Sequence, residues 1–166
     1  MTLFHKHGNG SLVANTATMV GDIVVGAGVN VWFGASLRGD VARITLGDHV
    51  NIQDNAVVHC DFDVPLTIES GVVVGHGAIV HGVFVGRDTL VGMGATILGG
   101  THIGEESIVA AGSVVPPNKT FPARSMLMGV PAKLVRTVSD EEVEITRATN
   151  RRYRELSSAY ARGEIL

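Results

Sequence analysis

The chain has 166 residues, enough for one domain with a substantial core, and its 13 basic against 16 acidic side chains leave a formal net charge of −3. This balance excludes the basic field that nucleic acid or an anionic membrane would require. The single cysteine, Cys60, excludes a disulfide framework, and the first ten residues, MTLFHKHGNG, lack the apolar stretch of a secretory signal, so we expect a cytoplasmic protein.

An apolar residue recurs at every sixth position through most of the chain. The period is interrupted by three inserted residues after Leu37 and four after Val58, and it is one residue short after Val80. The sixteen positions are Met19, Val25, Val31, Leu37, Leu46, Ile52, Val58, Ile68, Val74, Val80, Val85, Val91, Ile97, Ile103, Val109 and Val115. Such a fixed period, in a chain with 21 glycines, is the signature of a solenoid.

Each six-residue unit predicts one short strand followed by a tight bend. Glycine directly follows several of the apolar positions, as at Gly26, Gly47 and Gly75, where a Cβ would be strained. Three such strands close one triangular coil, and successive coils stack at about 4.8 Å. The alternative, a β-sandwich, would show a period of two with turn signals every ~8 to 12 residues, and this chain does not. We therefore expect an all-β protein, a parallel β-helix over residues 1–120.

The character of the chain changes twice after Val115. Residues 121–138 carry further prolines and predict an extended segment that crosses back over the coils. Residues 139–166 predict an α-helix, because Ser139 and Glu142 have the spacing of a capping box and Gly163 follows the periodic residues. The side chains expected to face the coils are Val143, Thr146, Asn150, Tyr153, Ser157 and Tyr160. The helix should pack alongside the coils, and the three segments should form one structural domain.

The six-residue register also predicts where polar side chains point. Counted by threes, the strands at Leu37, Val58 and Val80 lie on one face in consecutive coils. The residues that follow them, which are Arg38, His59 and His81, should form an outward ladder with a spacing of about 4.8 Å. His76 follows Val74 by two places and belongs near the edge of the preceding face, with Asp54 below it and Gln53 beside it.

Two stacked histidines and a third on another face point to a site shared between copies of the chain. Around a threefold axis, His76 of one copy would approach His59 and His81 of its neighbour. Three neutral imidazoles with an open fourth position form a zinc site. An isolated histidine is most often a surface residue without a ligand, and His5, His7, His49 and His102 are interpreted in that way.

Several motifs resemble the γ-class carbonic anhydrases and their bacterial homologues. They are SLRGD at 36–40, NIQDN at 51–55, VVH at 57–59, GHGAIVHG at 75–82, VGMGATIL at 91–98 and GVPAK at 129–133. The resemblance implies a left-handed β-helix and a homotrimer. It also implies a zinc ion held by His59 and His81 of one subunit and His76 of the next, with Fe2+ or Co2+ as alternatives to zinc.

The activity implied by this resemblance is the reversible hydration of CO2 to bicarbonate by zinc-bound hydroxide. The family pattern assigns Gln53 to the metal-bound water, and Arg38, Asp40 and Asp54 to linking subunits and orienting the pocket. For Arg38 and Asp40 a purely structural salt bridge is the competing interpretation.

The sequence departs from the best-known active members of that family. Val41 stands where they carry a glutamate, and the short loop CDFDVP replaces an acidic loop with a glutamate proton shuttle. Asp61 and Asp63 have less basic carboxyl groups and a shorter reach. The family's tyrosine in the C-terminal helix aligns with Ala148. These differences argue against fast proton export but leave metal binding intact.

Two other classes of function compete with this interpretation. Six-residue repeats also build acyl-CoA-dependent acyltransferases, in which one histidine acts as a general base, although such enzymes usually have longer loops. A noncatalytic, metal-stabilised trimeric scaffold is the other alternative. Cys60, beside His59, is interpreted as a packing residue and not as a nucleophile.

Overall fold

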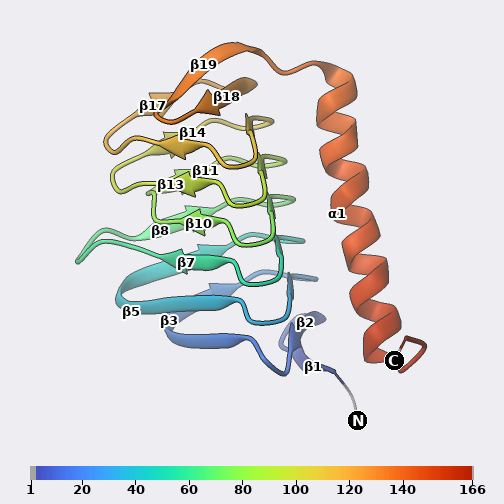
Figure 1. The fold of residues 1–166 in the computed structure, drawn as a ribbon. Helices are drawn as coiled ribbons and strands as arrows, with labels where there is room; N and C mark the ends of the chain where they lie inside the picture. The colour runs from blue at the N-terminus through green and yellow to red at the C-terminus, as the bar shows by residue number, and fades with distance from the viewer. Residues whose placement is uncertain (1–2, 166) are drawn as a thin grey trace.

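The periodic apolar residues form the core of a parallel β-helix, with one α-helix alongside it (Figure 1). The computed structural model describes residues 3–165. From Val31 to Val115 every predicted inward position is at most 1% exposed, and Met19 and Val25 at the first coil are partly buried. The expected fold class is confirmed.

The strand register confirms that three strands make one coil. Leu37 pairs with Met19 of the coil before it and with Val58 of the coil after it, and Val80 and Ile97 continue the column. Residues that stack in space are therefore about 17 to 22 positions apart in sequence, as the spacing of three units with insertions requires.

The first face of the prism is a nine-stranded sheet. Its strands pair in parallel except at the two ends, where β1 pairs with β2 and β18 with β19 in antiparallel orientation. In spatial order the strands are β1 (Phe4–His7), β2 (Ser11–Ala14), β4 (Asn30–Val31), β6 (Asn51–Ile52), β9 (Val73–Val74), β12 (Leu90–Val91), β15 (Ile108–Val109), β18 (Ser125–Gly129) and β19 (Ala132–Thr137).

The other two faces belong to a continuous ten-stranded sheet, because β3 (Thr18–Val25) and β5 (Ser36–Leu46) bend across the corner between them. The second face contains β7 (Val57–His59), β10 (Ile79–Val80), β13 (Thr96–Ile97) and β16 (Val114–Val115). The third face contains β8 (Leu66–Ile68), β11 (Phe84–Val85), β14 (His102–Ile103) and β17 (Thr120–Phe121). The three-residue insertion after Leu37 is absorbed within β5, whereas the insertion after Val58 forms the loop that projects at the left of Figure 1.

The β-helix extends further than the sequence pattern indicated. Val13 precedes the first predicted position by six residues and pairs with Val31. At the other end Phe121 pairs with Ile103, and Leu127 pairs with Val109. The expected boundary at residue 120 is therefore too early, and only β19 within 121–138 runs back antiparallel. In the sequence, the prolines of this coil were interpreted as the end of the repeat. They occupy bends, however, where no strand N–H is needed.

The glycines that follow the inward residues are required by the close approach of the next coil. A Cβ on Gly75 would lie 2.8 Å from the backbone nitrogen of Met93, and one on Gly47 would lie 2.5 Å from that of Ser70. Neither glycine has a positive φ. The steric expectation is confirmed, and its cause is the neighbouring backbone.

Helix α1 (Asp140–Ala161) begins at the predicted capping box. The Ser139 side chain accepts from the Glu142 backbone N–H, and the Glu142 side chain accepts from the Ser139 N–H. The helix packs on the first face through Val143, Thr146, Asn150 and Ser157, all buried, while Tyr153 and Tyr160 join an aromatic cluster with Phe4 and Trp32. No helix in the described part of the chain has the length and apolarity needed to cross a membrane.

Candidate metal centre

Two histidines lie one above the other on the second face. Arg38 of β5 pairs with His59 of β7, and the rings of His59 and His81 have centroids 5.1 Å apart with planes at 75°. Side chains at equivalent positions of adjacent parallel strands are neighbours because the coils stack in register. The predicted ladder of Arg38, His59 and His81 is confirmed as a placement.

Carboxylates accompany both histidines of the ladder. Asp40, at the corner in β5, accepts from Arg38 at 2.5 Å and lies 3.1 Å from His59 Nε2. The Arg38 hydrogen bond holds the pKa of the Asp40 carboxyl below its ordinary value. Asp61, from the loop after β7, places an oxygen 3.2 Å from His81 Nε2. This loop therefore does reach the site, through Asp61.

One imidazole nitrogen in this cluster has an unused lone pair or proton. His81 Nε2 is buried, and the Asp61 oxygen approaches it in a geometry that makes no hydrogen bond, so within residues 3–165 it has no hydrogen-bond partner. Leaving a buried polar atom unpaired costs free energy. A nitrogen of this kind, beside a second imidazole, suits a metal ligand.

His76 lies at the corner between the first and second faces. A Cβ on Gly75, just before it, would meet the next coil, and Gly77, just after it, has φ +64°. The Asp54 carboxylate lies 2.8 Å from His76 Nδ1, and the Tyr153 hydroxyl lies 2.8 Å from Nε2. The backbone N–H of His76 donates to the side chain of Gln53 at 3.2 Å.

Gln53 connects this corner to the interior. It is 3% exposed and donates to Asn51 at 3.0 Å, and Asn51 donates to Asn30 at 2.6 Å. Trp32 also donates to Asn30, at 2.8 Å. The network fixes the Gln53 amide, so its position beside His76 is determined by packing of the first face.

Tyr153 lies at the candidate site, a placement that the sequence interpretation missed. The aligned position, Ala148, is exposed on α1, whereas Tyr153 is partly buried and touches His76. Burial, and then the charge of Asp54, raises the pKa of the Tyr153 hydroxyl, which keeps it a neutral donor. Its expected position on the coil-facing side of the helix was the sequence signal that could have placed it at the site.

A single chain does not complete a metal site. Among residues 3–165 no three His, Cys, Asp or Glu side chains converge as metal ligands. His59 and His81 form one half, and His76 with Asp54 forms a separate half on another corner. The residues present therefore fit a tetrahedral metal only if a second copy supplies the missing half.

Cys60 takes no part in either half. It is 1% exposed, its thiol donates to the carbonyl of Ala42 at 3.4 Å, and burial raises its pKa. A thiol with a raised pKa is a poor nucleophile at neutral pH, which agrees with the packing role expected for it.

Comparison with known proteins extends these observations. Residues 82–117 match the family model described as bacterial transferase hexapeptide (six repeats). The carnitine operon protein CaiE of Escherichia coli (strain K12) is 46% identical over 148 residues, which cover 88% of this chain and 74% of CaiE. The mitochondrial γ carbonic anhydrase 2 of Arabidopsis thaliana is 39% identical over 155 residues, covering 90% of this chain and 56% of that protein.

A solved structure shows the same similarity. A hexapeptide transferase family protein from Anaplasma phagocytophilum superposes with a TM-score of 0.86 at 33% identity, covering 93% of this chain and 90% of that one. The similarities thus span the coils that carry the three histidines and are not limited to the repeat itself.

Proposed function

Because the chain belongs to the γ-carbonic-anhydrase-like family of hexapeptide-repeat proteins, we propose that three copies bind divalent metal ions at their shared interfaces and that these sites hydrate CO2 reversibly. Zinc is the metal that three imidazoles favour, with Fe2+ and Co2+ as alternatives. The substrate assignment rests on the family relationship.

The observation that carries the proposal is the incomplete pair of histidines on the second face. His59 and His81 stack at 5.1 Å, and His81 presents a buried nitrogen without a hydrogen bond in the described chain. Two imidazoles leave a tetrahedral ion short of ligands, and His76 of a neighbouring copy would supply the third.

The surroundings of His76 support its role as that third ligand. A carboxylate can only accept, so the Asp54 oxygen 2.8 Å from Nδ1 favours the His76 tautomer that carries its proton on Nδ1, whose Nε2 lone pair could then serve a metal. Carboxylates that orient metal-binding histidines in this way are a recurrent part of zinc sites.

The remaining polar residues have roles that follow from their positions. When bound, the metal supplies the Lewis acidity that brings the pKa of a water molecule to about 7. Arg38, held by Asp40, places a cationic guanidinium beside His59, where it would attract bicarbonate. Gln53 donates one amide hydrogen to Asn51 and keeps a second for a water or substrate oxygen.

Mixed trimers test the shared site. Alone, His59→Asn and His76→Asn should each abolish metal binding. Any trimer that contains both variants regains one intact interface, so random mixing at equal amounts should restore about one site in four. Metal content is measured by elemental analysis of protein purified without added zinc, together with a CO2 hydration assay. Mixed trimers that bind no metal would show that His76 does not act across the interface.

Acyl transfer is a second candidate, favoured by the transferase names of the matching family model and of the similar solved structure. It predicts turnover of acyl-CoA that does not require metal. Metal binding without either activity would instead support the trimeric scaffold.

A further inference from the structure

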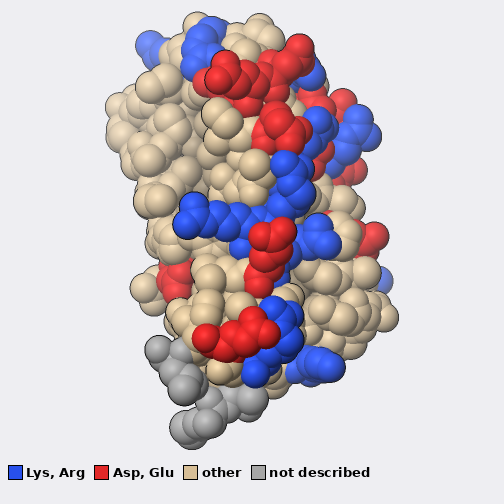
Figure 2. Space-filling view, turned by 90° about the vertical axis from the view of Figure 1, so that its right-hand side faces the viewer, with Lys and Arg blue, Asp and Glu red and all other residues tan. Residues whose placement is uncertain are grey.

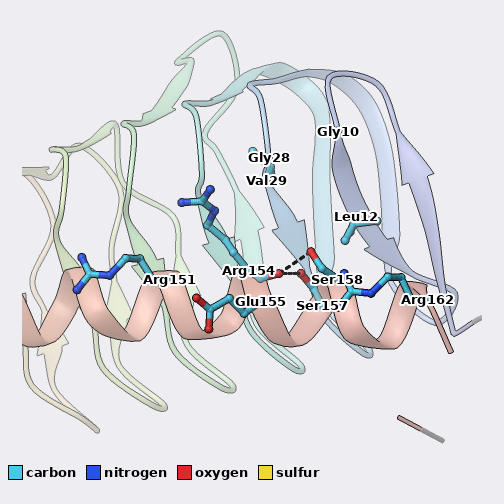
Figure 3. Close-up of a pocket in the computed structure, with 10 residues that line it drawn as sticks. All are labelled: Gly10, Leu12, Gly28, Val29, Arg151, Arg154, Glu155, Ser157, Ser158 and Arg162. Atoms are coloured by element: carbon cyan, nitrogen blue, oxygen red, sulfur yellow. Dashed lines mark hydrogen bonds between the residues drawn. The ribbon is translucent and has the colours of Figure 1, made fainter. Parts of the chain in front are cut away.

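A groove runs between α1 and the corner that leads from the third face into the first. Its central part has a volume of about 510 Å3 and is bordered by Gly10, Leu12 and Gly28 of the first coils. The helix lines it with Arg151, Arg154 and Arg162 and also with Glu155. In Figure 3 the Arg154 side chain rises toward the coils, whereas those of Arg151 and Arg162 lie along the helix on either side of it. This volume lies in the range of small-molecule sites.

The arginines form one stripe of the helix. Arg147, Arg151, Arg154 and Arg162 are separated by four, three and eight residues, which places them on one side at 3.6 residues per turn. Tyr153, one position before Arg154, is turned by about 100° and reaches His76. The groove and the candidate metal centre therefore lie on different sides of α1.

Arg154 differs from the other members of the stripe because no carboxylate in the described part of the chain pairs with it. Arg147 pairs with Asp88 and Glu106, Arg151 with Glu144, and Arg162 with Glu164. Within residues 3–165 no carboxylate pairs with Arg154, although its side chain is partly buried and lines both the central cavity and the adjoining one that contains His49.

Local helix stability does not explain this arrangement. Cations favour the last turn of a helix, but Arg154 lies seven residues before its end at Ala161. Like charges three or four positions apart, such as Arg151 and Arg154, disfavour the helix. Guanidinium groups held together at an open cavity repel one another, and an anion bound between them would offset this repulsion.

We propose that this groove binds a small phosphorylated ligand of nucleotide size. Guanidinium forks match phosphate oxygens in pairs, and Arg154 would hold a phosphate with Arg151 and Arg162 on either side. A long polyanion fits less well, because acidic and basic side chains alternate along the helix side of the molecule (Figure 2) and the chain carries a net charge of −3.

Isothermal titration calorimetry on the full chain, with ADP and inorganic pyrophosphate as probes, tests the assignment. Both should bind saturably, adenosine should not, and Arg154→Gln should weaken binding about tenfold or more. Arg152→Gln, which removes an exposed arginine two positions away, is the matched control. Arg154→Lys should bind with intermediate affinity, because it keeps the charge but loses the fork.

Three outcomes would overturn the proposal: no saturable binding of either phosphate probe, equal weakening by Arg152→Gln and Arg154→Gln, or adenosine binding as tightly as ADP. Circular dichroism confirms that each variant is folded. Metal content, measured on the same samples, is expected to be unchanged by Arg154→Gln, so the result is independent of the proposed CO2 hydration.

Discussion

Both ring nitrogens of His76 are already engaged within one chain. Asp54 lies 2.8 Å from Nδ1, and the Tyr153 hydroxyl lies 2.8 Å from Nε2. With the proton on Nδ1, the tyrosine must be the donor to Nε2. A metal that binds Nε2 has to displace this hydrogen bond, so Tyr153 competes with the metal for the same lone pair.

Tyr153→Phe should therefore strengthen zinc binding. Removing a hydrogen bond that must be broken gains about 0.5 to 1.5 kcal/mol, or an increase in affinity of about 2- to 10-fold. The affinity is measured by competition with a chromogenic chelator. Tyr160→Phe is the control, because Tyr160 packs in the same aromatic cluster and makes no contact with His76. Weaker zinc binding by Tyr153→Phe would mean that the hydroxyl supports the site.

At the scale of the elements, one carboxylate joins α1 to the strand before it. Glu142 caps the helix through the Ser139 N–H at 3.0 Å and pairs with Arg136 of β19 through both oxygens, at 2.7 and 2.8 Å. The Arg136 hydrogen bonds, and then the Ser139 N–H, lower the Glu142 pKa to about 2. A carboxyl group with a lowered folded-state pKa stabilises the fold above its unfolded value, and this contribution is lost as the pH falls.

Glu142→Gln should flatten the acid side of the stability profile. Glutamine keeps a capping oxygen but loses the charge. The native chain should lose stability as the pH falls from the unfolded-state pKa of glutamate, about 4.3, to about 2. The variant lacks this charge-dependent contribution at every pH and should not show that loss. Thermal unfolding followed by circular dichroism at pH 5 and pH 2.5 measures the difference. Glu141→Gln, an exposed neighbour for which the described chain offers no ion pair, should follow the native profile. Parallel profiles for all three proteins would contradict the expectation.

At the scale of the whole molecule, two exposed apolar side chains lie on the same face as the incomplete histidine pair. Val57 and Ile79 face outward in register on the second face, directly before the residues that lead to His59 and His81, and they are 38% and 40% exposed. A trimer interface along this face would bury them and complete the metal site with the same contact.

Ile79→Asp should convert the proposed trimer into monomers. Burying a charge at a packed interface costs more free energy than the association of this face provides. The mass measured by light scattering should therefore fall from about 52 kDa, the mass of three chains, to that of one chain, 17.4 kDa. Ile145→Asp, on the outer side of α1 and 56% exposed, should remain trimeric. The monomer should also lose its metal. A native chain that is already monomeric would refute the shared site.

Much of this architecture was predictable because the six-residue period records directly which side chains face the interior. Leu37, Val58 and Val80 specified one column, and Arg38, His59 and His81 followed on its outer side. The capping box at Ser139 located the helix start for a similar reason, since both of its hydrogen bonds join residues close in sequence. The last coil, at Phe121 and Leu127, escaped prediction because its prolines resembled the end of the solenoid.

The sequence alone therefore determined the coils, the faces and the two groups of histidines, because a repeating backbone makes long-range neighbours a matter of counting. The hand of the winding was supplied by the family resemblance, since a six-residue period is the same for either hand. Only the tertiary structure decided that Tyr153 meets His76, that Asp61 reaches His81, and that Arg154 lines a groove with no carboxylate of residues 3–165 paired to it. These contacts join the helix or a loop to distant coils, and they depend on how those elements dock, which no local periodicity encodes.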